Sequence, residues 1–153
     1  MFKRLIVGFA LLATLATWIN ASSWASPSEQ VTLQTSKAPG PGQPGTFEAT
    51  GAFADSGAID NLAFNFSAIG APTFVISHLT ILFTGAEGAF TLKTQNTETL
   101  TSDPNVLTDS GTWTIIDGMG AYADLHGQGT IVGTLDENAG LITRTFTGNV
   151  HFD

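Results

Sequence analysis

The sequence has no cysteine and few charged residues. Of its 153 residues, 12 % are charged, about half the usual share, and only five are Lys or Arg. Without Cys, the chain cannot form a disulfide scaffold, a cysteine-ligated zinc site or an iron–sulfur cluster. The shortage of basic residues argues against a nucleic-acid binder, because neutralising phosphates requires clustered Lys and Arg. Hydrophobic residues make up 42 %, which argues against disorder driven by net charge.

A hydrophobic run long enough to span a membrane is missing as well. Lys3 and Arg4 precede an apolar run from Leu5 to Ala16, which is about 12 residues long, whereas a spanning helix needs about 20. Small residues, Ser23 and Ala25, then suit a cleavage site. This pattern is typical of a secretory signal peptide, so we expect cleavage after residue 25 and a secreted or periplasmic protein.

The expected mature chain is strongly acidic. Only three basic residues remain after cleavage, Lys37, Lys93 and Arg144, against thirteen acidic ones. Such a chain is repelled by nucleic acid and by anionic lipid, so we expect neither nucleic acid nor membrane as a partner. Its length suffices for one hydrophobic core.

Proline and glycine divide the mature chain into two parts. Residues 26–45 hold four of the six prolines, and the run from Pro39 to Gly45 fits neither a helix nor a central strand. We interpret this part as a linker or a long crossing loop, with a short edge strand at 31–35. Residues 46–153 form the predicted β domain.

The β domain shows alternating or short apolar runs and no convincing helical period. Turn-forming residues separate these runs closely, which leaves no room for the crossover helices of parallel sheets, so the strands must form antiparallel hairpins. Eight strands of this kind favour an all-β, eight-stranded antiparallel up-and-down β-barrel of calycin-like form, with a two-sheet sandwich as the alternative. The predicted strands are 46–54, 58–67, 73–83, 88–95, 98–102, 111–117, 127–135 and 141–152.

The alternation also predicts which side chains share a face. In the last strand, Arg144 lies on an otherwise apolar face that includes Phe146. In strand 111–117, Trp113 and Asp117 share a face with Ile115. Strand 73–83 is apolar on both faces, which predicts that another subunit covers its outer face.

A glycine motif after strand 111–117 imitates a nucleotide-binding fingerprint. Gly118 and Gly120 give the pattern G-x-G-x-x-A, but Gly127 follows too soon for the helix that would receive a pyrophosphate. We therefore expect no nucleotide cofactor, and interpret the glycines as a wide turn that permits positive φ. Tyr122 and Leu125 would close the barrel end.

This stretch also carries a family resemblance. Residues 111–129 and the closing strand 144–152 resemble the C-terminal half of the allene oxide cyclase-like and dirigent-like barrels, and residues 46–57 resemble secreted bacterial relatives of that group. The resemblance implies an eight-stranded barrel with an apolar cavity, often assembled as a homotrimer. The catalytic acidic residues of the plant enzymes have no matching positions here, so no activity is carried over.

Six residues are candidates for ligand binding. Arg144 needs a carboxylate or a ligand anion if it lies inside the barrel, with Asp117 or Glu48 as the expected partner; alternatively it lies over a subunit interface. The other candidates each have a structural alternative, which is turn capping for Asp117, a hydrogen-bonded core or interface position for His78, and core packing for Trp113, Tyr122 and Phe146. His126 and His151 lack metal-ligand spacing, so no metal is expected.

Three classes of function remain open. The barrel could bind a small apolar molecule, act as a cyclase or isomerase on an apolar substrate, or serve as a structural trimer with a filled core. An enzyme should place at least two titratable side chains in one cavity, a binding protein needs a cavity with few, and a structural barrel needs none.

Overall fold

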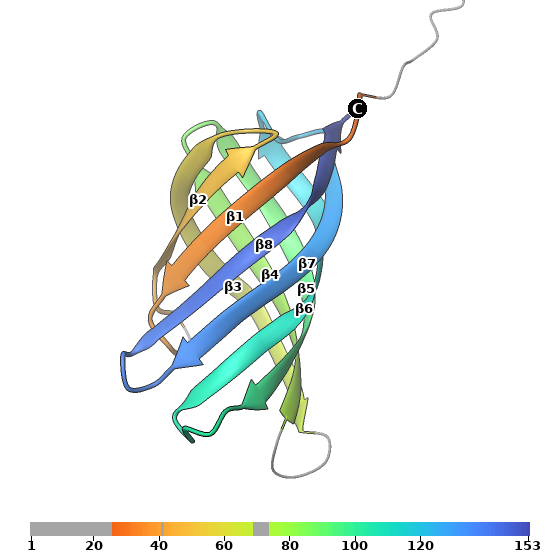
Figure 1. The fold of residues 1–153 in the computed structure, drawn as a ribbon. Coiled ribbons are helices and arrows are strands. Elements are labelled where there is room, and N and C mark those ends of the chain that lie inside the picture. The colour runs from red at the N-terminus through yellow and green to blue at the C-terminus, as the bar shows by residue number, and fades with distance from the viewer. Residues whose placement is uncertain (1–25, 41, 69–73) are drawn as a thin grey trace, which may run out of the picture.

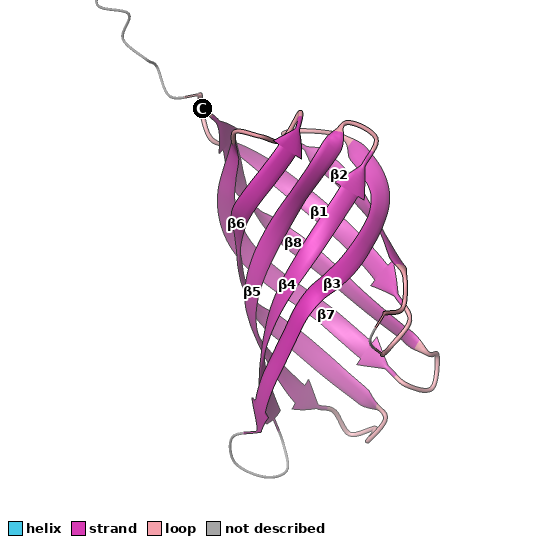
Figure 2. Cartoon of the chain, turned by 180° about the vertical axis from the view of Figure 1, so that it is seen from behind, coloured by secondary structure: helices cyan, strands magenta, loops and turns pink. Residues whose placement is uncertain are grey.

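The computed structural model describes residues 26–40, 42–68 and 74–153. The predicted signal peptide, residues 1–25, and the predicted turn at 70–72 lie outside the described residues. Among the described residues no helix is long and apolar enough to cross a membrane. Figure 2 shows strands and loops throughout.

Eight antiparallel strands form a closed barrel (Figure 1). Each strand pairs with the next in the chain, and the first closes the ring by pairing with the last. The predicted up-and-down barrel is thereby confirmed, and it is not a sandwich. The strands are β1 (Glu29–Lys37), β2 (Gly45–Gly51), β3 (Asp55–Ala68), β4 (Phe74–Gly85), β5 (Gly88–Leu100), β6 (Val106–Gly120), β7 (Leu125–Asp136) and β8 (Leu141–Phe152).

Two differences from the prediction change which segments form the barrel strands. The barrel begins at β1, which is longer than the short edge strand predicted at 31–35 and lies in the segment otherwise assigned to a linker or crossing loop. It pairs along its length with β8 and over Val31–Lys37 with β2. The Pro- and Gly-rich residues that follow form only the β1–β2 connection. The predicted strands 88–95 and 98–102 are a single strand, β5, which continues through Asn96 and Thr97.

The meander gives the barrel two distinct ends. The terminal end carries the start of β1, the end of β8 and the β2–β3, β4–β5 and β6–β7 turns (Figure 1). The distal end carries the β1–β2, β3–β4, β5–β6 and β7–β8 connections. There β3 and β4 project furthest (Figure 2).

Two bulges shift the inward–outward alternation. In β3 the register shifts between Asn61 and Ala63, so that Phe64 pairs with the buried Leu79 of β4 and shares the inner face. In β6 the shift leaves Ile116 without a partner in β5. Because a bulge adds one residue to one strand, every side chain beyond it changes face.

Glycines make room for large inward side chains. Trp113 of β6 lies beside Gly129 of β7, which pairs with Gly148 of β8. A Cβ added at Gly148 would lie 2.5 Å from the Trp113 ring, closer than any real Cβ contact. The Trp113 indole N–H donates to the carbonyl of Thr130 at 3.1 Å, so this buried ring is both packed and hydrogen-bonded.

Candidate functional site

Aromatic rings fill the barrel interior toward the terminal end. Phe83 and Phe90 stack with their centroids 4.9 Å apart, and Phe47 contacts both edge-on. Tyr122 of the β6–β7 turn packs against Phe90 at 5.2 Å. Rings that interlock in this way pack the interior of this part of the barrel.

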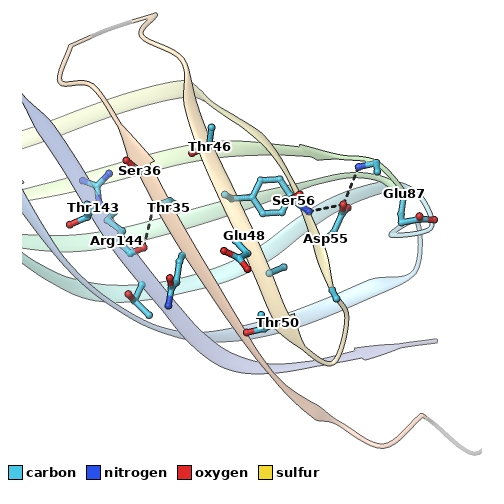
Figure 3. Close-up of a pocket in the computed structure, with 16 residues that line it drawn as sticks. Thr35, Ser36, Thr46, Glu48, Thr50, Asp55, Ser56, Glu87, Thr143 and Arg144 are labelled. Atoms are coloured by element: carbon cyan, nitrogen blue, oxygen red, sulfur yellow. Dashed lines mark hydrogen bonds between the residues drawn. The ribbon is translucent and has the colours of Figure 1, made fainter.

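A hydrogen-bonded carboxylate closes the terminal end. The Tyr122 hydroxyl donates to Oδ2 of Asp55 at 2.7 Å. The backbone N–H groups of Ser56 and Ala86 donate to Oδ1 of the same carboxylate (Figure 3). Burial alone would raise the pKa of Asp55, but the hydrogen bonds from Tyr122, Ala86 and Ser56 favour the carboxylate, and its net pKa is lowered. Burial and the bond to Asp55 raise the pKa of Tyr122. This pair ties β3 to the β6–β7 turn.

Toward the distal end the interior contains a buried charged layer. Arg144 Nε donates a short hydrogen bond to Oδ2 of Asp109, which also accepts from the Asn96 amide at 3.1 Å. The Arg144 guanidinium lies 3.8 Å from the Glu98 carboxylate, and the Ser77 hydroxyl donates to that carboxylate at 3.0 Å. Buried charges are tolerated where they are paired and hydrogen-bonded, as Arg144 Nε and Asp109 Oδ2 are. The second carboxylate oxygen of Asp109, Oδ1, is buried without a hydrogen-bond partner among the described residues.

The register explains how Arg144 reaches Asp109. Gly133 of β7 pairs with Asp109 on one side and with Arg144 on the other. A Cβ at Gly133 would lie 2.8 Å from Cγ of Arg144. Because glycine has no side chain, the Arg144 side chain can pass over this position and reach Asp109.

A pocket of about 420 Å³ lies on the distal side of this layer. Its volume falls within the range of about 300–1,000 Å³ that small-molecule sites occupy. Its polar residues include Lys37, Asn61, Glu98 and Arg144, and its other lining residues are Leu62, Ala63, Phe64, Leu79, Leu135 and Ile142, with Pro39, Gly40 and Gly42 of the β1–β2 connection. We call it the distal pocket.

A pair of exposed aromatic rings adjoins the distal pocket, which Phe64 lines. Phe64 and Phe66 pair with the inward Leu79 and Ser77 of β4, yet they are 56 % and 61 % exposed because β3 projects beyond the rest of the barrel. Their centroids are 5.5 Å apart. Paired exposed rings on an inner face form an apolar patch of the kind that marks ligand sites.

Two wider hollows lie on the outer surface. One, of about 900 Å³, extends across β1, β2 and β8, where Ser36, Thr46, Glu48 and Thr143 line it (Figure 3). The other, of about 970 Å³, includes Thr112, Gln128 and Asn149. Both are broad and lined largely by outward polar residues, whereas ligand pockets are concave and mostly apolar, so the distal pocket is the better candidate.

Of the six predicted ligand-binding residues, only Arg144 lines the distal pocket. Its partners are Asp109 and Glu98, not the expected Asp117 or Glu48. Glu48 is exposed on the outside of β2.

The other five lie elsewhere. Trp113 and Phe146 are buried in the core, and Tyr122 is buried at the terminal end. His78 is exposed on the outside of β4. The predicted shared face of Trp113 and Asp117 is wrong, because the bulge at Ile116 turns Asp117 outward to pair with Thr91 and leaves it exposed.

The two C-terminal histidines are neighbours on adjacent strands. His126 and His151 pair across β7 and β8 with ring centroids 5.5 Å apart, and each lies near the Asp153 carboxylate, at 3.3 and 3.5 Å. Within residues 26–40, 42–68 and 74–153, no group of three or more His, Cys, Asp or Glu is arranged to hold a metal ion.

Sequence reasoning missed Lys37, Asp109 and Glu98. Lys37 continues the alternating row Val31, Leu33, Thr35 of β1, which would have placed it inside had β1 been counted as a barrel strand. Asp109 lies four residues before Trp113 and shares its face, but the predicted strand began only at Gly111. Lys37 and Asp109 could both have been found by continuing the alternation of inward and outward side chains to the true ends of their strands.

Comparisons of this chain with family models, with curated proteins and with solved structures find no match. The distal pocket itself is therefore the basis for assigning a function.

Proposed function

We propose that this protein is an exported barrel of the allene oxide cyclase-like or dirigent-like kind that binds a small apolar molecule in the distal pocket. The observation that carries the proposal is the pairing of an apolar lining with a charged layer at its base. The lining would hold an apolar body, and a few polar groups would fix its orientation. Export rests on the pattern of residues 1–25 alone.

A fluorescence assay tests this proposal. N-phenylnaphthylamine, whose emission rises in apolar surroundings, is titrated into the protein and then displaced with nonanol. Phe64→Ser removes a ring from the pocket lining and should weaken probe binding about tenfold, since burying such a side chain is worth about 1.5–3 kcal/mol. Val132→Ser is the control, because Val132 is 61 % exposed, close to the 56 % of Phe64, but lies on the outer face of β7. Equal probe binding by wild type and Phe64→Ser would exclude the pocket.

A second candidate function is a cyclase or isomerase. Two titratable groups, Lys37 and Glu98, line one pocket, which meets the criterion set above for an enzyme. Turnover of an apolar substrate that is lost in Glu98→Gln, with nonanol binding retained, would support catalysis over simple binding. A structural barrel with a filled core gains support only from the aromatic terminal end.

Homotrimer formation also stays a proposal. The subunit number three is what the family resemblance implies. A subunit partner would cover the outer face of β4, where Ile76 and Leu82 are half-buried and His78 is exposed in the single chain. Sedimentation of the purified protein would measure the subunit number directly.

A further inference from the structure

Lys37 is a buried amine without a partner. It ends the inward row of β1 beside the distal pocket and is only 4 % exposed. Its Nζ makes no hydrogen bond to any residue that the structure describes. An ammonium group in such a place is costly, because a buried charge needs both a counter-charge and acceptors.

The neighbouring charges already interact with one another. Arg144 is engaged by both carboxylates of this part of the interior, Asp109 and Glu98, so with an unprotonated Lys37 the layer holds one cation and two carboxylates. An anionic ligand would bring a further negative charge to this layer, whereas a neutral ligand would bring none.

The environment also favours the unprotonated amine. Burial lowers the pKa of Lys37, and the nearby charge of Arg144 lowers it further, while the Asp60 carboxylate opposes both without reversing the direction. A lysine desolvated in this way is a better nucleophile than one in water, because only the neutral amine has a free electron pair.

We propose that Lys37 Nζ forms an imine with an apolar aldehyde or ketone held in the distal pocket. The nitrogen attacks the carbonyl carbon to give a carbinolamine, and the carbon–oxygen bond then breaks. The oxygen leaves as water and takes with it both hydrogens of the amine, so no oxidant or reductant takes part. This inference rests on the proposed binding function and specifies its ligand as a carbonyl compound.

Reductive trapping with nonanal tests the inference. The purified protein is incubated with nonanal and cyanoborohydride, which reduces an imine to a stable secondary amine, and the labelled lysine is identified by peptide mass spectrometry. Lys93, exposed on the outside of β5, is an internal control within the same chain. At low aldehyde concentration we expect at least tenfold more labelling at Lys37 than at Lys93, and we expect excess nonanol to suppress only the Lys37 adduct.

Two variants complete the test. Lys37→Arg keeps a long basic side chain but cannot form a stable imine, so its pocket-specific labelling should vanish, while Lys93→Arg should leave the Lys37 adduct unchanged. The ratio of Lys37 labelling to Lys93 labelling is measured on the wild type, so it tests the inference even if Lys37→Arg fails to fold.

Equal labelling of the two lysines, or an adduct that nonanol does not suppress, would overturn the inference. If nonanol displaces the naphthylamine probe but nonanal gives no Lys37 adduct, the imine is refuted and the binding function stands; if nonanol displaces nothing, the binding function fails too.

Discussion

Toward the terminal end the barrel interior is filled by aromatic rings, whereas toward the distal end it holds a buried ion pair beneath an apolar pocket. Phe83, Phe90 and Phe47 contact one another directly and need no other partner. Arg144 and Asp109 are buried as well, yet they are stable only as a pair. Apolar side chains would fill the distal end at lower cost, so the buried charges there are better explained by the binding function proposed above than by stability.

The largest effect should come from breaking the charged layer. Arg144→Met leaves Asp109 and Glu98 buried without their cation, which should lower the free energy of unfolding by about 3–5 kcal/mol. Probe binding should weaken as well, because Arg144 lines the distal pocket. Thermal and urea melts measure the loss. The double variant Arg144→Met/Asp109→Leu should recover part of it; a double variant less stable than the single one would contradict the pairing.

A turn at the terminal end should affect stability alone. Gly120 has φ of +67°, and an added Cβ would lie 2.8 Å from the Glu87 carbonyl oxygen. Gly120→Val should therefore destabilise the barrel by about 1–3 kcal/mol. Measured in the same urea titrations, an unchanged midpoint would show that the turn accepts an L side chain. Probe affinity of the folded variant should match the wild type.

The Tyr122–Asp55 bond should make part of the terminal-end stability depend on pH. Tyr122→Phe removes one donor to the carboxylate and should cost about 1–2 kcal/mol at neutral pH. Because the folded pKa of Asp55 is lowered, its contribution is present above the unfolded pKa of 3.8 and is lost as the pH falls through the folded pKa. The difference between wild type and variant should therefore shrink on acidification below about pH 4. A difference that grew at low pH would be incompatible with this bond.

The smallest predicted effect is a gain in stability rather than a loss. Lys37→Met replaces an unpartnered buried amine with an apolar side chain and should stabilise the barrel by about 1 kcal/mol at neutral pH. Because burial lowers the folded pKa of Lys37, the wild type gains stability as the pH rises toward the unfolded pKa of 10.5, and the advantage of the variant should diminish there. Urea melts at neutral and alkaline pH test this; a destabilised Lys37→Met would mean that the ammonium has a stabilising partner.

The barrel could be predicted from the sequence because alternation and close turns are local signals. The break predicted within β5 has a physical cause, since Asn96 and Glu98 face inward as part of the charged layer and interrupt the apolar row. The same layer made Arg144 visible as a cation on an apolar face, but its partners lie on β5 and β6, and only the register brings them together.

The distal pocket could not be predicted, because it depends on a bulge. Without the register shift near Leu62, the row of Ile59 and Asn61 would continue inward through Ala63, and Phe64 would face solvent on the outside. The bulge at Ile116 has the converse effect and removes Asp117 from the interior. A bulge leaves the period of two intact on either side, so the sequence pattern alone does not reveal it.

The most direct test of the difference between the two ends is a methyl NMR titration of the protein with nonanol. The account predicts shifts for the methyl groups of Leu79, Leu135 and Ile142, which line the distal pocket. The methyl groups of Leu33, Ile59 and Val150, in the core outside that pocket, should not move. Saturable shifts confined to the first set would support the distal pocket as the binding site. Shifts confined to the second set, or none at saturating nonanol, would contradict it.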